Sequence, residues 1–183
     1  MRIIAGRYKG TRLAALGKGD AGAHLRPTTD RVRESLFNVL HTYLDWDGLR
    51  VLDLFAGTGA LGLEAYSRGA AHITFVENGR VGQKILSQNI DVVQGGADMT
   101  VLKCDATRLP HGTPCDVVFL DPPYGKNLGG AALQSAQAKG WIAPDALIIW
   151  EENATMSAPG QRVLNSRRYG DTWITLLQPD QMV

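Results

Sequence analysis

Hydrophobic residues from Arg50 onward follow two alternating patterns, the first of which consists of short, nearly continuous apolar runs. These runs predict five buried strands, over residues 51–55, 72–77, 100–103, 117–120 and 146–151. In the second pattern apolar residues recur at helical spacing, which predicts helices over residues 60–68, 81–93 and 128–139. Strands that alternate with helices build a parallel sheet covered on both faces, so the sequence predicts the α/β class.

The C-terminal part and a segment before the first strand follow other patterns. Residues 162–169 and 173–178 alternate around a Gly-Asp turn, which predicts a hairpin whose antiparallel strand closes the sheet. Residues 30–44 carry apolar side chains at helical spacing and predict an amphipathic helix. The sequence therefore predicts one sheet with helices, preceded by an additional helix.

The N-terminal segment differs from the rest in charge. Residues 2–13, with two glycines, predict a short hairpin appended outside the core. The whole chain has 19 Lys and Arg against 18 Asp and Glu, but the first 33 residues hold eight basic and two acidic side chains. A basic arm on an acidic body is expected where a segment meets phosphates, although a solvated end fits the charges equally well. We divide the chain into a basic arm, residues 1–29, and a domain, residues 30–183.

Length and composition exclude several classes of protein. A chain of 183 residues, 44% of them hydrophobic, suits one folded core. No apolar run approaches the roughly 20 residues that cross a bilayer, and the start lacks the apolar region of a signal peptide. We therefore expect a cytoplasmic protein without a membrane partner. Cys104 and Cys115 do not form a CxxC pair, and the four histidines show no metal spacing, so we expect no metal.

A glycine-rich turn follows the first predicted strand. Gly57 and Gly59 lack a Cβ and allow the backbone to turn sharply and approach a ligand closely. Ligands of open parallel sheets bind at the carboxyl ends of the strands, where this turn lies. The spacing from Gly57 to Gly62 also fits GxGxxG, with Glu77 about 20 residues on, as in dinucleotide-binding proteins. The glycines alone therefore leave the cofactor open.

Acidic residues at the strand ends favour a cationic cofactor. Asp53 would repel a pyrophosphate but attract the ammonium and sulfonium of S-adenosylmethionine. Glu77 ends the second strand, where it can accept hydrogen bonds from ribose hydroxyls. Asp105 follows the third strand, where it can accept from the exocyclic amine of adenine. Each residue alone fits a cap or a surface charge equally well, but together they favour S-adenosylmethionine.

The fourth strand runs into Asp121-Pro122-Pro123-Tyr124. Two successive prolines restrict the backbone, so the Asp121 carboxylate and the Pro122 carbonyl are held in fixed directions. Two acceptors can orient the hydrogens of a nucleobase amine and stabilise positive charge on it as it attacks a methyl group. Tyr124 offers a flat face on which an extruded base can stack. A merely rigid turn is the structural alternative.

These motifs resemble those of known proteins. Asp53-Leu-Phe-Ala-Gly57-Thr-Gly59 with Asp121-Pro-Pro-Tyr124 is similar to the class I methyltransferases that use S-adenosylmethionine and act on amines. Arg2-Ile-Ile-Ala-Gly6 and Arg26-Pro-Thr-Thr-Asp30-Arg-Val-Arg33-Glu34 more narrowly resemble the RsmD family, which methylates the exocyclic N2 amine of one guanine in bacterial 16S rRNA. The resemblance covers essentially the whole chain. It implies a seven-stranded Rossmann-like sheet with an antiparallel last strand.

The resemblance also implies a set of site residues. It implies cofactor contacts at Asp53, Phe55, Gly57, Gly59, Glu77, Asp105 and Ala106. It implies a catalytic pocket for the target nucleobase at Asp121, Pro122 and Tyr124. We expect RNA contacts at Arg7, Lys9, Arg26, Thr28, Arg31 and Arg33, with Arg12 as a helper. Thr28 has a helix cap as its structural alternative, and Arg33 an ion pair with Asp30. The implied substrate is the assembled small ribosomal subunit rather than naked RNA, and we expect a monomer.

Three other functions fit parts of the sequence. A methyltransferase acting on adenine N6 in DNA can use the same tetrapeptide, although the chain has little room for a domain that reads duplex sequence. A nicotinamide-dependent oxidoreductase fits GxGxxG but not Asp53. A non-catalytic RNA-binding module fits the basic arm but leaves the tetrapeptide without a role.

Overall fold

The computed structural model describes residues 1–15, 29–123 and 125–180. Its strands are β1 (Arg50–Leu54), β2 (His72–Val76), β3 (Met99–Leu102), β4 (Cys115–Leu120), β5 (Ile142–Glu152), β6 (Gln161–Tyr169) and β7 (Thr172–Pro179). Its helices are α1 (Asp30–Leu40), α2 (Ala60–Ser67), α3 (Arg80–Val92) and α4 (Leu128–Ala138), with a 3-10 helix η1 (Ala106–Arg108) after β3.

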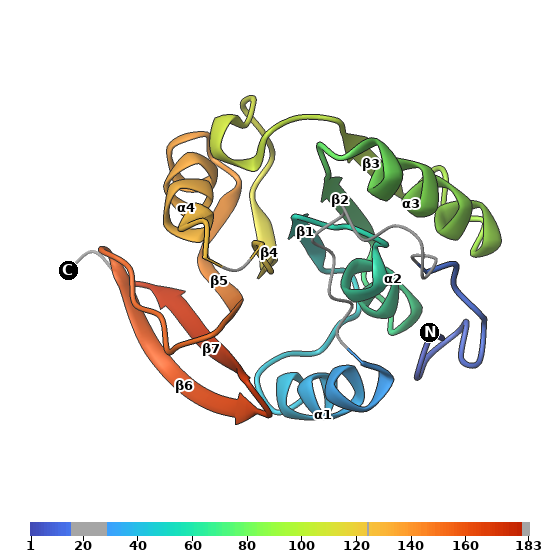
Figure 1. Cartoon of the computed structure of the whole chain (residues 1–183), viewed down its shortest axis with the longest axis horizontal. Helices are drawn as coiled ribbons and strands as arrows, with labels where there is room; N and C mark the ends of the chain where they lie inside the picture. Colours follow the sequence, from blue (N-terminus) through green and yellow to red (C-terminus); the bar gives the residue numbers. More distant parts are fainter. Residues whose placement is uncertain (16–28, 124, 181–183) are drawn as a thin grey trace.

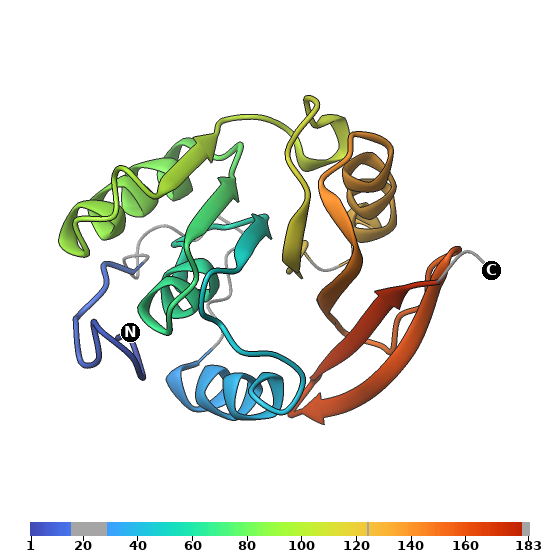
Figure 2. The same ribbon diagram turned by 180° about the vertical axis from the view of Figure 1, so that it is seen from behind.

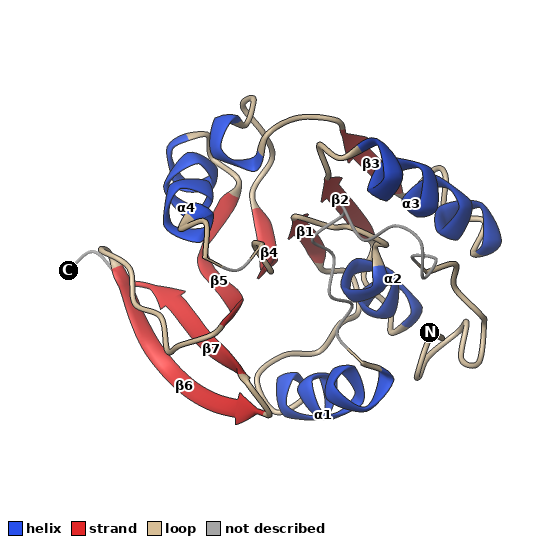
Figure 3. Ribbon diagram, in the orientation of Figure 1, coloured by secondary structure: helices blue, strands red, loops and turns tan. Residues whose placement is uncertain are grey.

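The strands form one seven-stranded sheet in the order β3-β2-β1-β4-β5-β7-β6 (Figures 1 and 3). Neighbours from β3 to β5 are parallel, whereas β7 is antiparallel to both β5 and β6. The predicted α/β class and the antiparallel last strand are confirmed. The chain winds from β1 out to β3 and then returns to β4 beside β1. The strand order therefore reverses between β1 and β4, where open sheets bind ligands at the carboxyl ends of their strands.

Two apolar layers cover the sheet because successive strand residues point to opposite faces. Residues such as Val51, Phe75 and Phe119 pack with α1, α2 and α3 in one buried cluster. Alternating neighbours such as Leu52 and Leu120 pack with α4 and η1 in the other. Figure 2 shows the same arrangement from behind, with α1, in light blue, at the bottom of the view. Among the described helices, none combines the length and apolar character needed to cross a membrane.

The helix predicted to reach Leu44 ends at Leu40. His41 to Tyr43 form a turn that leads the chain away from the helix axis. The reason lies in Trp46, which is buried and packs against Phe37 with ring centroids 5.1 Å apart. The chain must reverse shortly after Leu40 so that this indole returns to the core. Leu44, which the prediction placed in the helix, therefore packs against the core from the segment after the turn.

The N-terminal segment corrects the prediction of an appended hairpin. Arg2 and Arg12 form an antiparallel bridge, in agreement with a short hairpin, but Ile3 and Leu13 belong to the core cluster on the α1 side, so the segment is not an appendage. At Gly6 a Cβ would lie 1.8 Å from the Ser67 carbonyl oxygen, so only glycine allows this approach to α2. The segment is therefore part of the folded core in residues 1–15. The division between residues 29 and 30 stays a prediction.

Glu64 on α2 joins this segment to two helices. Its carboxylate accepts hydrogen bonds from the backbone N–H groups of Ile4 (2.7 Å) and Ala5 (3.1 Å) and from the Arg68 side chain (2.8 Å). The guanidinium of Arg33 lies 3.9 Å away, and both side chains have 0% exposure. Arg33 also donates to Asp30 at 2.9 Å. A buried pair of this kind is held by its hydrogen bonds, and losing one partner leaves the other charge uncompensated.

Replacing Glu64 by leucine should lower the free energy of unfolding by about 3–5 kcal/mol, because it removes the acceptor of the Ile4 and Ala5 N–H groups and one of the two carboxylates that face the buried Arg33. The change should be measured by urea denaturation. Glu34→Ala, at an exposed position on α1, serves as a control and should change the stability by less than about 0.5 kcal/mol. A Glu64→Leu protein as stable as the wild type would show that the pair does not hold the segment.

Candidate active site

Carboxylates gather at the carboxyl edge of the parallel strands. Asp53 is the residue before the last in β1, Glu77 directly follows β2, and Asp121 directly follows β4. β5 ends in Glu151 and Glu152, which were not among the predicted site residues. Their position at the end of an apolar run was the signal that sequence reasoning could have used. Negative charge on Glu151, Asp53 and Glu152 acts on Asp121, so these carboxylates share one site.

The turn after β1 is held in an uncommon conformation. Phe55, Gly57 and Gly59 have φ angles of 62°, 55° and 78°. An aromatic residue rarely adopts positive φ, and such strain often marks a ligand-binding turn. A Cβ at Gly59 would lie 2.4 Å from the Leu86 side chain of α3. The turn therefore needs glycine at Gly59 both for its backbone angle and for close packing against α3.

Glu77 supports the turn from β2. One carboxylate oxygen accepts from the Gly57 N–H at 2.7 Å, and the other accepts from the Gly79 N–H at 2.6 Å. A Cβ at Gly82 would lie 2.8 Å from the Glu77 carboxyl carbon, so α3 leaves room for this buried side chain. Each oxygen of a carboxylate has two lone pairs, so Glu77 keeps acceptor capacity toward a ligand. Its contact with ribose stays a prediction.

Asp53 has the most unusual environment of the carboxylates on β1 to β3. Only 2% of its surface is exposed, and one oxygen accepts from the Gly62 N–H at 2.9 Å. Burial raises the pKa of Asp53 to about 7, the Gly62 hydrogen bond opposes that rise, and the Glu77 charge adds to it. Among the described residues, no basic side chain forms an ion pair with Asp53.

Asp105 is held differently, at the start of η1. It accepts hydrogen bonds from the Thr107 N–H (2.9 Å) and hydroxyl (2.8 Å), which lower its pKa. Its side chain is 41% exposed, while the next residue, Ala106, is buried. Asp105 is therefore ionised and open to solvent on one side, in keeping with a ligand contact. The predicted contacts of Asp105 and Ala106 remain untested.

Asp121 and Pro122 follow β4 as predicted. Asp121 is half-buried, and Pro122 is buried behind it. Burial raises the pKa of Asp121 well above its usual range, and the negative charges of Glu151, Asp53 and Glu152 add to the rise. Tyr124, the predicted stacking residue, lies outside the described residues. Strongly perturbed carboxyls at a sheet switch point are typical of functional sites.

The predicted RNA contacts fall into three groups. Arg7, Lys9, Arg12 and Arg31 are exposed, and Arg26 and Thr28 lie outside the described residues. The structure does not fit the predicted RNA contact at Arg33, because its guanidinium is fully buried and donates hydrogen bonds to Asp30 and the Arg2 carbonyl oxygen. In this conformation it has no surface for a phosphate, so its role is structural. The helix cap is Thr29, whose hydroxyl accepts from the Val32 N–H.

Asn89 on α3 connects the N-terminal segment to the glycine turn. Its amide nitrogen donates to the carbonyl oxygens of Thr58 (2.8 Å) and Ala14 (3.1 Å). Its amide oxygen accepts from the Ala14 N–H at 2.7 Å. Thr58 lies between the two glycines of the turn, so one buried side chain fixes both the turn and the basic segment. Sequence reasoning missed this residue because its helical position looks like any core position of α3.

Known proteins share this arrangement and sequence. A family model described as Conserved hypothetical protein 95 matches residues 1–178. Ribosomal RNA small subunit methyltransferase D of Escherichia coli strain K12 is 38% identical over 160 residues, which cover 87% of this chain and 78% of that protein. The chain belongs to the RsmD family.

Other similarities extend over the full length of this RsmD-family chain. Putative rRNA methyltransferase YlbH of Bacillus subtilis is 35% identical, covering 96% of this chain and 97% of the relative. The solved structure of putative methyltransferase yhhF from Escherichia coli is 35% identical and has a TM-score of 0.85, covering 100% and 99% of the two chains. The predicted enzyme class, a methyltransferase, is confirmed. The similarities do not favour the DNA-directed alternative.

Among the described residues, no three His, Cys, Asp or Glu side chains form a group that could hold a metal ion. The carboxyl edge of the sheet carries the side chains of Asp53, Glu77 and Asp121. Their negative charge suits a cationic organic ligand.

Replacing Asp53 by asparagine should change how stability depends on pH. The folded-state pKa of about 7 lies above the unfolded value of 3.8, so the folded protein binds the proton more tightly. Wild-type stability should therefore fall as pH rises from about 4 to 7, and the Asp53→Asn protein should lack this part of the fall. The difference should reach the order of a few kcal/mol by pH 8.

Urea denaturation at pH 5, 6, 7 and 8 measures this difference. Asp145→Asn, at an exposed position near the start of β5, is the matched control and should follow the wild type throughout. A constant stability difference between Asp53→Asn and wild type from pH 5 to 8 would contradict the raised pKa.

Proposed function

We propose that this protein transfers a methyl group from S-adenosylmethionine to the exocyclic N2 amine of a guanine in the RNA of the small ribosomal subunit. One observation carries the proposal. In an RsmD-family chain, the carboxylates of Asp53 and Asp121 stand at the ends of adjacent parallel strands, and the negative charge of Asp53 acts on Asp121. This arrangement places a residue proposed to contact the cofactor beside a residue proposed to bind the target nucleobase, at the sheet switch point.

The residues present fit S-adenosylmethionine. Bound there, this cofactor supplies an electrophilic methyl group on a positively charged sulfur. Asp53 is a buried carboxylate with a raised pKa, and a neighbouring cation would favour its ionised form. Glu77 and Asp105 retain acceptor oxygens for hydroxyl and amine donors. The strained turn at Phe55 and Gly57 lets the backbone approach the ligand closely.

Asp121 and Pro122 orient the target amine in this proposal. The Asp121 carboxylate and the Pro122 carbonyl oxygen each accept one amine hydrogen, which directs the nitrogen lone pair toward the methyl donor. As the amine attacks, positive charge develops on its nitrogen, and the nearby carboxylate stabilises that charge. The raised pKa of Asp121 also suits it to receive the proton that the amine loses. Tyr124 is proposed to stack on the extruded base.

The substrate is proposed to be the assembled small subunit, and the enzyme a monomer acting in the cytoplasm. The exposed basic residues Arg7, Lys9 and Arg31 support this proposal because they offer charge for phosphates near the site. Arg12, Arg26 and Thr28 complete the proposed RNA contacts. The names of the relatives, which refer to the RNA of the small subunit, support the substrate class.

Replacing Asp121 by asparagine should lower kcat about 100- to 10,000-fold, because the amide can neither stabilise the charge nor accept the proton. Binding of S-adenosylmethionine, measured by calorimetry, should persist. Activity should be measured with labelled S-adenosylmethionine and small subunits that lack the modification, and the methylated nucleoside identified by mass spectrometry.

Asp145→Asn, near the opposite edge of the sheet, should keep wild-type activity. Near-normal turnover by Asp121→Asn would refute the assigned role. A product other than N2-methylguanosine, or methyl transfer to adenine in DNA instead, would refute the proposed substrate.

A further inference from the structure

The far end of the β6–β7 hairpin reaches the same edge of the sheet as the candidate active site. Both β5 and β6 are antiparallel to β7, so their carboxyl ends coincide. Across the strands, Arg167 pairs with Ile174, and Ile174 pairs with Glu151. Neighbouring strands lie about 4.8 Å apart, so Arg167 is roughly 10 Å along the sheet from the Glu151 backbone. Sequence reasoning assigned this hairpin only to closing the sheet.

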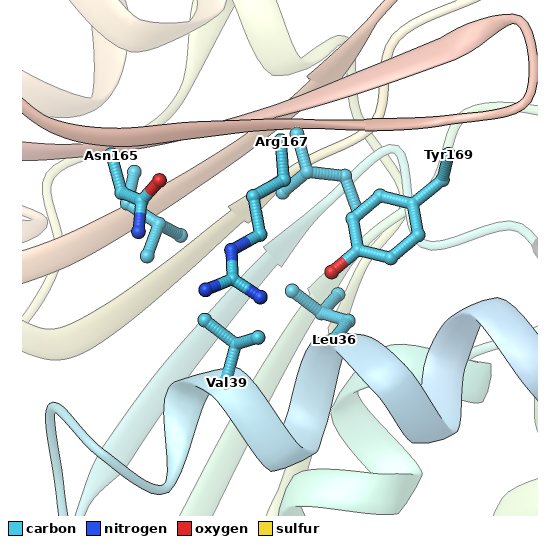
Figure 4. Close-up of a pocket in the computed structure, with 7 residues that line it drawn as sticks. Leu36, Val39, Asn165, Arg167 and Tyr169 are labelled. Carbon is cyan, nitrogen blue, oxygen red and sulfur yellow. The ribbon is translucent and has the colours of Figure 1, made fainter.

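Helix α1 completes a surface with this end of β6. The Ser35 and Tyr169 hydroxyls are 3.5 Å apart, which joins the first turns of α1 to the last residue of β6. Arg31 lies four residues before Ser35 and therefore on the same face of the helix. Figure 4 shows the Arg167 and Tyr169 side chains directed toward α1, above Leu36 and Val39. We call Arg31, Arg167 and Tyr169 the β6–α1 surface.

In the part of the chain that the structure describes, the two arginines of this surface have no acidic ion-pair partner. Arg31 and Arg167 are both exposed. Asp30 directly precedes Arg31 but pairs with Arg33 and Arg2, whereas Glu34 and Asp171 are exposed. The Arg167 side chain extends over Leu36 and Val39 of α1, and its exposed, planar guanidinium suits phosphate. The half-buried Tyr169 adds a hydroxyl and an aromatic ring to this surface.

Charges on an edge strand also have a simpler role, which is to prevent sheets from pairing with other chains. Arg162 allows the two roles to be separated. It lies on the same strand, is also exposed, and stands at the amino end of β6, about 17 Å from Arg167 at the rise of an extended strand. If the charges only protect the edge strand, Arg162 and Arg167 should be equally important. If they bind substrate, only Arg167, at the active-site edge, should be important.

We propose that the β6–α1 surface binds the phosphate backbone of the substrate RNA beside the target base. The proposal rests on the proposed function and extends it. The basic N-terminal segment packs on α2 and α3, toward the β3 end of the sheet, while β6 is the opposite edge (Figure 1). The RNA is therefore held on both sides of the site between β1 and β4. Such a two-sided grip fixes the position of the extruded base better than the basic arm alone.

Methylation kinetics of small subunits that lack the modification test this proposal. Arg167→Gln should raise KM about 3- to 10-fold with kcat kept within twofold, and should reduce the slope of log(kcat/KM) against log salt by about 1. Arg31→Gln, on a separate element, should have the same effect. Arg167→Lys should restore most of the salt slope because it keeps the charge. Arg162→Gln should behave as wild type in KM and in salt slope.

Each other outcome has a distinct meaning. Equal KM values for Arg167→Gln and Arg162→Gln would overturn the proposal and leave edge protection as the role of both arginines. A raised KM with an unchanged salt slope would also overturn it, and would indicate contact with protein rather than phosphate. Absence of methyl transfer by the wild-type enzyme would instead refute the proposed function.

Discussion

The gathering of buried and half-buried carboxyl groups around Asp53 and Asp121 is the constraint on which the rest of the site depends. The two residues stand at the ends of adjacent parallel strands, and burial deprives both carboxylates of water. The fold holds them together through the continuous β1–β4 pairing, and the Gly62 N–H partly stabilises the charge on Asp53. A folded protein gains nothing from such an arrangement by itself. A cationic ligand between the carboxylates would offset their negative charge, which explains why the negative edge and the strained glycine turn occur together.

Buried polar side chains also connect the N-terminal segment to the site. Glu64 and Asn89, both buried, bind backbone groups of this segment, and Asn89 also holds the Thr58 carbonyl of the glycine turn. The proposed RNA-binding segment and the proposed cofactor turn are thus fixed by the same helices. A polar network of this kind holds its geometry only while every member is satisfied. The basic segment is therefore part of the core that shapes the site, and its basic side chains extend from a backbone that buried hydrogen bonds hold in place.

Much of this architecture follows from local pattern. The apolar runs around Val51 and Val117 could only be buried strands, and the rule that ligands bind at carboxyl ends placed Asp53, Glu77 and Asp121 on one edge before the structure did. What could not be predicted depends on contacts between distant segments. The burial of Arg33 requires Glu64, thirty-one positions later, and looked like a surface charge in sequence. Arg167 comes near the site only because β7 returns antiparallel between β5 and β6.

The most direct test of the central claim is a crystal structure of the protein with sinefungin, an analogue that carries an amine where S-adenosylmethionine carries its methylsulfonium group. The account predicts that the analogue lies across the ends of β1 and β4, with its amino-acid ammonium toward Asp53 and the substituting amine facing Asp121. Binding at another place, or with that amine directed away from Asp121, would contradict it.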